Sequence, residues 1–355
     1  MKTIIFTGGG SGGHVIPALT IIQKLKESKK NYQIVYFGSY KGIESTIVPE
    51  QVDRYIGIST GKIRRYLSFE NVKDIFKIGL GLIQSFIKLL SYSSKDTVIF
   101  STGGFVSVPV VIAGKITGKK VYVHEQTTRM GLANKVSSYF ANKVFVSFEE
   151  SLKFIKGNAF YSGYPVRSEC FDHQLRVKTF KHIDLSTIDK PLFFITGGGN
   201  GSLLINERIK EVLDELKEQY VVIHQVGKNF LKEYESFNDE SYLALDFVQE
   251  GMIDLFKKAE VILSRAGAGT VCELMALKKK SIFIPLKIAQ KNEQYHNAMA
   301  AKELCGSVVC TEDELQNKSL TALIEELKVS QDKGYGSGVK DGLEYLKNEI
   351  EAVLE

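Results

Sequence analysis

Short apolar runs alternate with amphipathic stretches along the whole chain, and several of the apolar runs end in a glycine-rich turn. Residues 3–6, 97–100 and 192–195 are apolar runs of strand length. Each is followed by a turn rich in glycine and then by residues with the period of a helix. A strand, a tight turn, a helix and a second strand form a βαβ unit, which implies a parallel sheet. The pattern therefore predicts an α/β protein.

The pattern begins again after a polar connector, which predicts two doubly wound domains. The turn at residues 7–14 (TGGGSGGH) recurs almost letter for letter at 196–202 (TGGGNGS). A length of 355 residues also exceeds what one hydrophobic core usually serves. We expect one domain over residues 1–165 and a second over 166–339, with a helix in 340–355 that packs back on the first. Ligands bind at the carboxyl ends of parallel strands, so we expect the site in a cleft between facing domains.

Residues 71–90 have the pattern of a long helix with one apolar face. Its apolar positions follow a helical period, and they are Val72, Ile75, Phe76, Leu80, Ile83, Ile87 and Leu90. One interpretation is an amphipathic helix that packs on the sheet. The other adds that its end, with Phe86, Ile87, Leu89 and Leu90 beside Lys88, touches a membrane surface near the basic residues Lys62, Arg64 and Arg65.

Composition and charge narrow the choice of partners. The net charge of +5 permits an anionic ligand or an anionic membrane surface without requiring nucleic acid. The alternation of aromatic and basic residues that is typical of a single-strand nucleic-acid groove is absent, so no nucleic-acid partner is expected. The four cysteines have no metal-binding spacing and are expected to be reduced thiols. We expect neither a signal peptide nor an apolar run of the ~20 residues that span a bilayer.

The stretch 261–297 carries the strongest candidate site. An apolar strand at 261–263 leads into the turn 265–269, and we expect a helix that opens near Thr270 and holds Glu273 in its first turn. Such a turn lets backbone N–H groups approach an anion, and the helix behind it presents its positive end. A carboxylate there can accept hydrogen bonds from ribose hydroxyls, although acidic residues are common near any helix N-terminus. The spacing is not G-x-G-x-x-G, which disfavours hydride transfer.

Six motifs in sequence order make the chain similar to the MurG family of glycosyltransferases. They are TGGGSGGH at 7–14, GGFVSVP at 103–109, HEQ at 124–126 with GLANK at 131–135, GYPVR at 163–167, RAGAGTVCE at 265–273 and QYHNA at 294–298. The resemblance covers essentially the whole chain. It implies a GT-B fold, in which two Rossmann-like, doubly wound domains face each other across a cleft.

The resemblance also implies an activity. It is the inverting transfer of N-acetylglucosamine from UDP-N-acetylglucosamine to an undecaprenyl-linked muramoyl-pentapeptide in peptidoglycan synthesis, with no cofactor and no essential metal. The lipid-linked acceptor implies a peripheral position at the cytoplasmic face of the cell membrane, on its anionic surface. Two alternatives stay open, which are a GT-B-like nucleotide-sugar epimerase and a non-catalytic protein that binds UDP-sugars.

By the same resemblance, individual residues receive candidate roles. His14 is the candidate base, with Glu125 as a weaker alternative, although either His14 or His124 could instead hold a structural hydrogen bond. Within the donor set, Glu273 would hold the ribose, Val248 the uracil, Asn200 to Ser202 the diphosphate, and Glu293 and Gln294 the sugar. The full donor set is Ser11, Gly12, Gly13, Asn134, Arg167, Asn200, Gly201, Ser202, Val248, Arg265, Gly267, Ala268, Gly269, Thr270, Glu273, Glu293 and Gln294. The acceptor set is Gly103, Gly104, His124 and Gln126.

Overall fold

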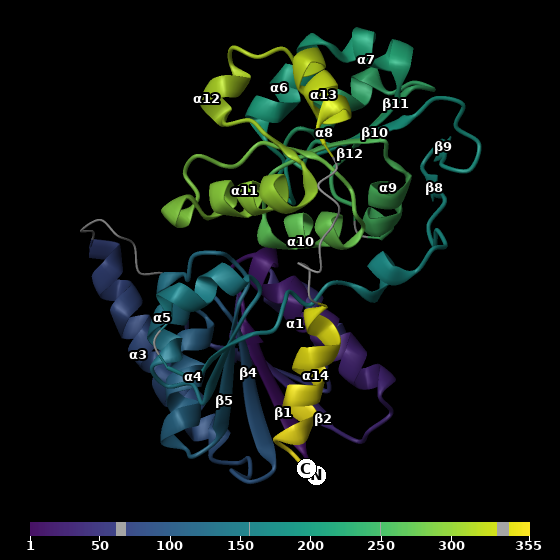
Figure 1. The fold of residues 1–355 in the computed structure, drawn as a ribbon. Helices are drawn as coiled ribbons and strands as arrows, with labels where there is room; N and C mark the ends of the chain where they lie inside the picture. The colour runs from purple at the N-terminus through teal and green to yellow at the C-terminus, as the bar shows by residue number, and fades with distance from the viewer. Residues whose placement is uncertain (62–68, 156, 249, 332–340) are drawn as a thin grey trace. The chain divides into compact units, whose positions relative to one another are not determined.

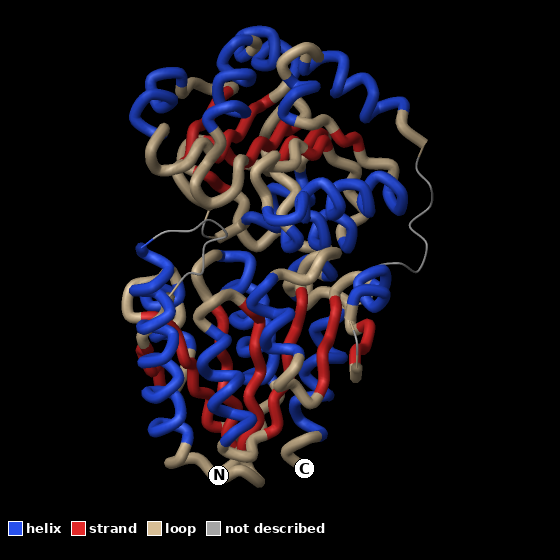
Figure 2. The backbone as a smooth tube through the Cα atoms, turned by 90° about the vertical axis from the view of Figure 1, so that its left-hand side faces the viewer, coloured by secondary structure: helices blue, strands red, loops and turns tan. Residues whose placement is uncertain are grey.

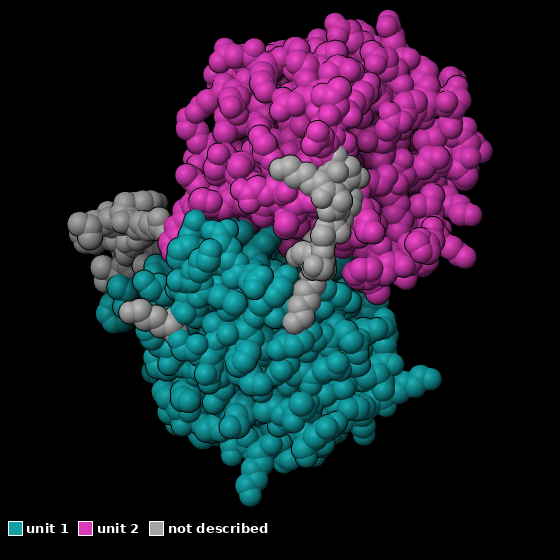
Figure 3. Space-filling model, in the orientation of Figure 1, with its two compact units in different colours: residues 1–166, 340–355 teal, residues 167–339 magenta. Residues whose placement is uncertain are grey.

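The computed structural model describes residues 1–61, 69–155, 157–248, 250–331 and 341–355, and the chain divides into two compact units (Figures 1 and 3). The first unit holds Met1–Val166 and Lys340–Glu355, and the second holds Arg167–Val339. Each unit is built around its own parallel sheet, which confirms the predicted α/β class with two doubly wound domains.

The first unit has a seven-stranded parallel sheet of order β3-β2-β1-β4-β5-β6-β7. The strands are β1 (Thr3–Gly8), β2 (Gln33–Ser39), β3 (Arg54–Ile58), β4 (Thr97–Gly103), β5 (Lys120–Glu125), β6 (Lys143–Val146) and β7 (Ala159–Tyr161). Its helices are α1 (Gly12–Glu27), α2 (Glu44–Ile47), α3 (Phe69–Leu89), α4 (Ser107–Ile116), α5 (Leu132–Ser138) and α14 (Gly342–Ala352). Short 3-10 turns lie at Pro49–Gln51 and Glu149–Phe154.

Helices cover both faces of this sheet, because successive strand residues point to opposite sides. Ile4 and Phe6 pack with α1 and α14 on one face, while Ile5 and Ile99 pack with α3 and α4 on the other. The last helix therefore contributes to the core of the first unit, although it follows the whole second unit in sequence (Figure 1).

The second unit has a six-stranded parallel sheet of order β12-β11-β10-β13-β14-β15 and a small antiparallel hairpin, β8–β9 (Figure 1). Figure 2 shows the strands of this sheet between helices. The strands are β8 (Thr179–Phe180), β9 (Ile183–Asp184), β10 (Leu192–Thr196), β11 (Val221–Gln225), β12 (Tyr242–Leu245), β13 (Val261–Ser264), β14 (Ile282–Phe283) and β15 (Val308–Val309). The helices are α6 (Leu203–Glu211), α7 (Leu213–Gln219), α8 (Leu231–Tyr234), α9 (Met252–Lys258), α10 (Ala268–Ala276), α11 (Glu293–Cys305), α12 (Glu312–Leu315) and α13 (Leu320–Val329). Short 3-10 turns lie at Ser168–Phe171, Glu235–Phe237 and Gln290–Asn292.

The orientation of α3 corrects one prediction. The apolar stripe that was expected to face the sheet is exposed, and Phe76, Ile83 and Ile87 have exposed fractions of 74%, 58% and 59%. The inward face carries Leu89, which is buried, and Phe86, which packs on the same core. Gly81 allows this close packing, because a Cβ there would lie 2.1 Å from the carbonyl oxygen of Ser59. Phe86 and Leu89 are therefore unavailable to a membrane; Lys62, Arg64 and Arg65 lie outside the described residues.

One helix boundary differs from the expectation. Helix α10 begins at Ala268, so Glu273 lies in its second turn and not in its first. Helix α1 begins at Gly12 and contains Pro17 as its sixth residue. The helical stretch that begins at Leu203 is interrupted at Val212, whose backbone leaves the helical region with a φ of −121°.

Candidate active site

Two glycine turns interlock at the carboxyl edge of the first sheet, where β1 and β4 are neighbours. Gly9 donates its N–H to the carbonyl of Gly103 at 3.2 Å. Gly104 has a φ of +82°, and a Cβ there would lie 2.2 Å from the carbonyl oxygen of Gly9. Only glycine fits at that position. The contact fixes the first turn and leaves Ser11 and Gly13 exposed where α1 begins.

His14 is oriented by the second turn. Its Nδ1 lies 3.0 Å from the carbonyl oxygen of Thr102, and the Thr102 hydroxyl donates to the His14 carbonyl at 2.6 Å. A carbonyl oxygen can only accept, so Nδ1 carries the proton when the ring is neutral. Nε2 then holds the free lone pair. The geometry is that of a half-buried histidine prepared to accept a proton.

The predicted catalytic alternative, Glu125, is fully engaged in the loop that follows β5. Its carboxylate accepts from the Thr127 N–H at 3.0 Å, the Thr127 hydroxyl at 2.8 Å, the Gly131 N–H at 3.1 Å and the Asn134 amide at 3.0 Å. These four bonds match the four acceptor positions of a carboxylate. Because the residue is also buried, it fits a structural role and not that of a general base.

His124 lies at the end of β5 and Gln126 directly after it, and both are buried, which disfavours the predicted contact with the sugar acceptor. His124 is fully buried, with Nε2 3.2 Å from the carbonyl oxygen of Gly163 and Nδ1 3.2 Å from the Gln126 amide nitrogen. Burial lowers the pKa of His124 to about 4, so the ring is neutral near pH 7. Both side chains hold the β5 loop in place.

Asn134 is a third residue whose burial does not fit direct substrate contact. It is buried, and its amide nitrogen donates to the carbonyl of His124 at 3.2 Å and to Glu125 at 3.0 Å. Its Oδ1 approaches Gly103, where a Cβ would lie 2.7 Å away. Asn134 therefore supports the second glycine turn from below.

In the second unit, Gln225 connects the turn after β10 to the segment after β12. Its amide nitrogen donates to the Thr196 hydroxyl at 3.1 Å and to the carbonyl of Gly198 at 2.8 Å. Its Oε1 accepts from the Val248 N–H at 3.0 Å. The Val248 N–H is therefore already paired. If Val248 binds uracil as predicted, its carbonyl is the backbone group that would do so. The same turn leaves Asn200 exposed.

Arg265 connects three other loops at this edge. Its guanidinium donates to the Ser202 hydroxyl at 2.7 Å and to the carbonyl of Ile284 at 3.1 Å, and it forms an ion pair with Glu312 at 2.7 Å. Arg265 was predicted to bind the sugar donor, but its guanidinium is already held by these three protein groups.

Helix α10 presents its N-terminus at the same edge, with Glu273 behind it. Gly267 is the N-cap, and residues 267–270 are partly exposed. Arg167 binds the Glu273 carboxylate through both oxygens, at 2.6 Å from Nε and 2.8 Å from Nη2. Burial alone would lower the pKa of Arg167, but Glu273 raises it above its ordinary value. Two of the predicted donor-binding residues are thus brought together as a bidentate pair, and the carboxylate keeps lone pairs for further donors.

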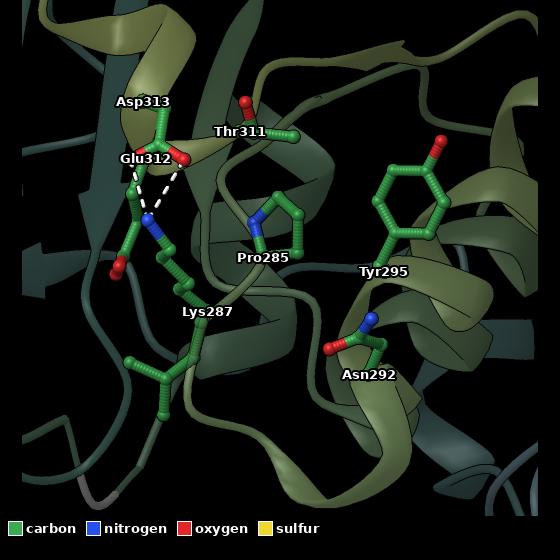
Figure 4. A pocket seen from close by; sticks show the side chains of 8 residues that line it. Pro285, Lys287, Asn292, Tyr295, Thr311, Glu312 and Asp313 are labelled. Carbon is green, nitrogen blue, oxygen red and sulfur yellow. Dashed lines mark hydrogen bonds and ion pairs between the residues drawn. The ribbon is translucent and has the colours of Figure 1, made fainter.

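The start of α11 lines a pocket of about 160 Å³ (Figure 4). Tyr295, Pro285 and Thr311 lie on its wall, and on the side opposite Tyr295 the Lys287 ammonium lies 2.8 Å from both carboxylate oxygens of Asp313. The Gln294 side-chain oxygen accepts from the Leu286 N–H at 3.0 Å. Gln294 therefore fixes the loop that precedes the helix through its side-chain oxygen. Its side-chain NH₂ group supplies the hydrogen-bond donors for a ligand.

A buried polar network supports the turn that carries Asn200. His224 lies 3.1 Å from Asn206 Oδ1 and 3.1 Å from the Tyr242 hydroxyl, and Asn206 donates to the carbonyl of Val226 at 3.0 Å. A Cβ on Gly201 would lie 1.9 Å from that Val226 oxygen. The network thus fixes the backbone against which the turn rests.

Acid should weaken the second unit through this network. Burial lowers the pKa of His224 to about 3, whereas an unfolded histidine titrates near 6.5. The unfolded state therefore binds more protons between these values, and stability is lost as pH falls below about 6.5. We expect His224 to cost about 1.4 kcal/mol between pH 7.5 and 5.5.

Urea unfolding at the two pH values measures this cost. The His224→Gln variant cannot take up the proton, so its stability should fall by about 1.4 kcal/mol less over the same interval. Equal pH slopes in the two proteins would show that His224 does not contribute.

The sequence comparisons extend this geometry to known proteins. Residues 4–146 match the glycosyltransferase family 28 N-terminal domain, and residues 192–338 match the glycosyltransferase family 28 C-terminal domain. A relative from Lachnospira eligens is 39% identical over 332 residues, which cover 92% of this chain and 91% of the relative. It is named UDP-N-acetylglucosamine–N-acetylmuramyl-(pentapeptide) pyrophosphoryl-undecaprenol N-acetylglucosamine transferase. The chain belongs to the MurG family, within glycosyltransferase family 28.

Further comparisons agree with this assignment. A Bacillus cereus relative that carries the same name with the number 2 is 38% identical, and the match covers 100% of both chains. Among solved structures, Acinetobacter baumannii MurG has a TM-score of 0.68 at 21% identity, covering 99% of this chain and 100% of that one. The UDP-GlcNAc 2-epimerase of Methanocaldococcus jannaschii has a TM-score of 0.65 at 15% identity, with the same coverage. At these identities the two structures show the shared fold of this MurG-family chain and nothing more specific.

Several residues that build the site were missed by the sequence analysis. Glu44 is fully buried, and its carboxylate accepts from the Gly10 N–H at 3.1 Å and from the Ser39 N–H at 3.2 Å. Gln225 and Glu312 were missed as well. No sequence signal marks them, since Glu44 and Glu312 each begin a short helix and Gln225 ends an ordinary strand. Among the described residues, no group of three or more His, Cys, Asp or Glu side chains is placed to hold a metal ion.

Proposed function

We infer that the chain transfers N-acetylglucosamine from UDP-N-acetylglucosamine to a lipid-linked N-acetylmuramoyl-pentapeptide. The observation that carries this inference is the end-to-end match at 38–39% identity to transferases named for that reaction. The candidate site has groups that suit a nucleotide-sugar, because the second unit offers a helix N-terminus, glycine turns and a buried carboxylate at one edge of its sheet.

The donor contacts follow from the chemistry of the groups in the second unit. Glu273, held by Arg167, accepts hydrogen bonds from the ribose hydroxyls. The Val248 carbonyl accepts from the uracil. The N-terminus of α10 and the turn that ends at Ser202 face the diphosphate, since both present donors to an anion. Glu293 and the Gln294 amide bind the hydroxyls of the sugar.

The transfer needs one base and stabilisation of the leaving group. The acceptor hydroxyl oxygen bonds to the anomeric carbon, the bond from that carbon to the diphosphate oxygen breaks, and its electron pair leaves with UDP. His14 Nε2 takes the hydroxyl proton, because Thr102 holds Nδ1 in the protonated form. Helix N-terminal N–H groups stabilise the charge that grows on the diphosphate.

Release of UDP tests this function. We expect release from UDP-N-acetylglucosamine only when a short-chain, lipid-linked muramoyl-peptide is present, both with and without EDTA. An isomerised sugar formed without acceptor would indicate an epimerase. UDP binding without turnover would indicate a non-catalytic UDP-sugar-binding protein.

For the membrane we propose that the exposed stripe of α3 lies on an anionic lipid surface. Phe76, Ile83 and Ile87 are large, apolar and more than half exposed. Neighbouring helices add exposed Ile116, at the end of α4, and Tyr139, after α5. The exposed cations Lys88, Lys115 and Lys135 lie on the same three helices. Apolar side chains beside cations suit the boundary between acyl chains and anionic headgroups.

Such a surface would hold the chain at a bilayer without crossing it. In the described part of the chain, no helix has the length and apolarity needed to span a membrane. A peripheral position at the cytoplasmic face of the cell membrane would bring the first unit to a lipid-linked acceptor.

Vesicle binding measures the contribution of the stripe. The combined change Phe76→Ser, Ile83→Ser and Ile87→Ser should weaken binding to anionic vesicles about 100-fold, because each side chain contributes about 1 kcal/mol when partly buried in lipid. The fold should persist because these side chains face solvent. Val329→Ser, an equally exposed apolar position on the second unit, is the matched control. Unchanged sedimentation of the triple variant, or binding that ignores anionic lipid and salt, would contradict the proposal.

A further inference from the structure

The Ser202 hydroxyl has both of its acceptor positions occupied. Ser202 is the N-cap of α6, and its Oγ accepts from the Ile205 N–H at 3.4 Å and from Arg265 Nη2 at 2.7 Å. A hydroxyl has two acceptor lone pairs and one proton to donate. Both lone pairs are taken, and no described residue accepts the proton. Since Ser202 is only 6% exposed, few directions remain for that proton.

We infer that Arg265 is a positioning residue that commits the Ser202 hydroxyl to donate to a phosphate oxygen of the nucleoside diphosphate. This inference rests on the proposed function, because it assigns a role within the donor site. Without Arg265, the hydroxyl could accept from solvent or substrate donors as readily as it donates. With Arg265 in place, the only ligand atom that satisfies Ser202 is an acceptor.

Arg265 is itself held rigidly enough for this role. Its side chain is 11% exposed, and the guanidinium contacts Ile284 at 3.1 Å and Glu312 at 2.7 Å as well as Ser202. The planar fork of arginine suits three partners in fixed directions, and a lysine ammonium cannot reproduce it. The contacts join the loops that follow β10, β13, β14 and β15. Glu312 offsets the charge of Arg265, so the main effect of Arg265 on the ligand is exerted through Ser202.

The surroundings of Ser202 favour a phosphate oxygen over a sugar hydroxyl. The hydroxyl stands at the start of the nine-residue helix α6, whose first N–H groups lack intrahelical acceptors. Gly198 and Gly201, with φ of +85° and +74°, bring the preceding turn close to the helix. The site therefore presents donors to its ligand, which matches an oxygen that carries negative charge and no proton.

A double-mutant cycle on UDP affinity tests the inference. Ser202→Ala should raise the Kd for UDP about tenfold, the usual effect of one hydrogen bond to a charged group. Arg265→Lys keeps the charge but loses the fork, and it should raise the Kd by a similar factor. Because Arg265 acts through Ser202, the double variant should bind UDP within about twofold of Arg265→Lys alone. Ser202→Thr keeps the hydroxyl, so it should bind UDP with most of the wild-type affinity that Ser202→Ala loses.

Ser319→Ala is the matched control. Ser319 caps α13 in the same way, by accepting from the Ala322 N–H at 3.1 Å, but no arginine in the described part of the chain donates to it. Its loss should lower stability without changing the Kd for UDP, which separates cap loss from ligand contact. Thermal unfolding of each variant confirms that it is folded.

The outcomes separate the inference from the proposed function. If the increases in the Kd for UDP multiply in the double variant, Arg265 and Ser202 act independently. If Ser202→Ala leaves the Kd for UDP unchanged, the hydroxyl does not reach the phosphate. Either result overturns the inference while UDP still binds the wild-type chain. Failure of the wild-type chain to bind UDP would instead contradict the proposed function.

Discussion

Replacing His14 with alanine should lower kcat about 10²–10⁴-fold, the range that a general base usually contributes. The reason is the fixed tautomer, in which the Thr102 carbonyl holds Nδ1–H and leaves Nε2 to take a proton. The affinity for UDP should stay near the wild-type value, because His14 belongs to the first unit and the donor contacts proposed for UDP lie in the second. Steady-state kinetics with saturating donor and acceptor measure the loss.

The control for this change is His182→Ala. His182 is an exposed histidine between β8 and β9 of the second unit, and its ring nitrogen lies 2.8 Å from the carbonyl oxygen of Asp239. Its removal should leave kcat unchanged. If His14→Ala kept a near-wild-type kcat and changed only KM, His14 would be a binding residue and the base would have to be sought elsewhere.

Changing Glu273 to glutamine should weaken UDP binding by about 1–3 kcal/mol, or 5- to 150-fold. Glutamine has nearly the same shape but offers the ribose one neutral acceptor in place of a charged carboxylate. It also leaves Arg167 without the anion that it binds through two hydrogen bonds. Titration calorimetry with UDP gives the change directly.

The ribose itself provides a sharper version of this experiment. A UDP analogue that lacks both ribose hydroxyls should bind the wild-type and Glu273→Gln proteins with nearly equal affinity, because the lost contact is absent in both cases. Glu326→Gln removes a carboxylate that pairs with Lys318 on the surface of the second unit and should change neither affinity. Equal UDP affinity of the wild-type and a folded Glu273→Gln variant would rule out the ribose contact.

Local patterns predicted the elements of this fold, because strands and glycine turns are encoded by neighbours in sequence. The turn at Gly8–Gly10 and its repeat at Gly197–Gly199 both follow a buried strand, as expected. The inward face of α3 could not be predicted in the same way. That helix is apolar on two sides, and the side that packs is decided by Gly81 against Ser59, a contact made in the folded state.

The candidate site shows the same division. The motifs identified the right loops, but the side chains within them serve different purposes. His124 and Glu125 belong to a conspicuous motif, yet their hydrogen bonds are used inside the protein. The partner of Arg265 is Glu312, which is distant in sequence and carries no motif. Such partners depend on how β13 and β15 are placed in one sheet, and a linear pattern does not record that placement.

The position of α14 has a consequence for how the chain is made. Leu343, Leu346 and Ile350 complete the core beside α1, but a ribosome reaches them only after it has synthesised the whole second unit. Residues 167–339 can close their own core as soon as they emerge, whereas the first unit waits with an apolar face uncovered. The usual order of folding, in which the N-terminal domain matures first, is therefore reversed, and a truncated product would expose its defect in the part of the protein made earliest.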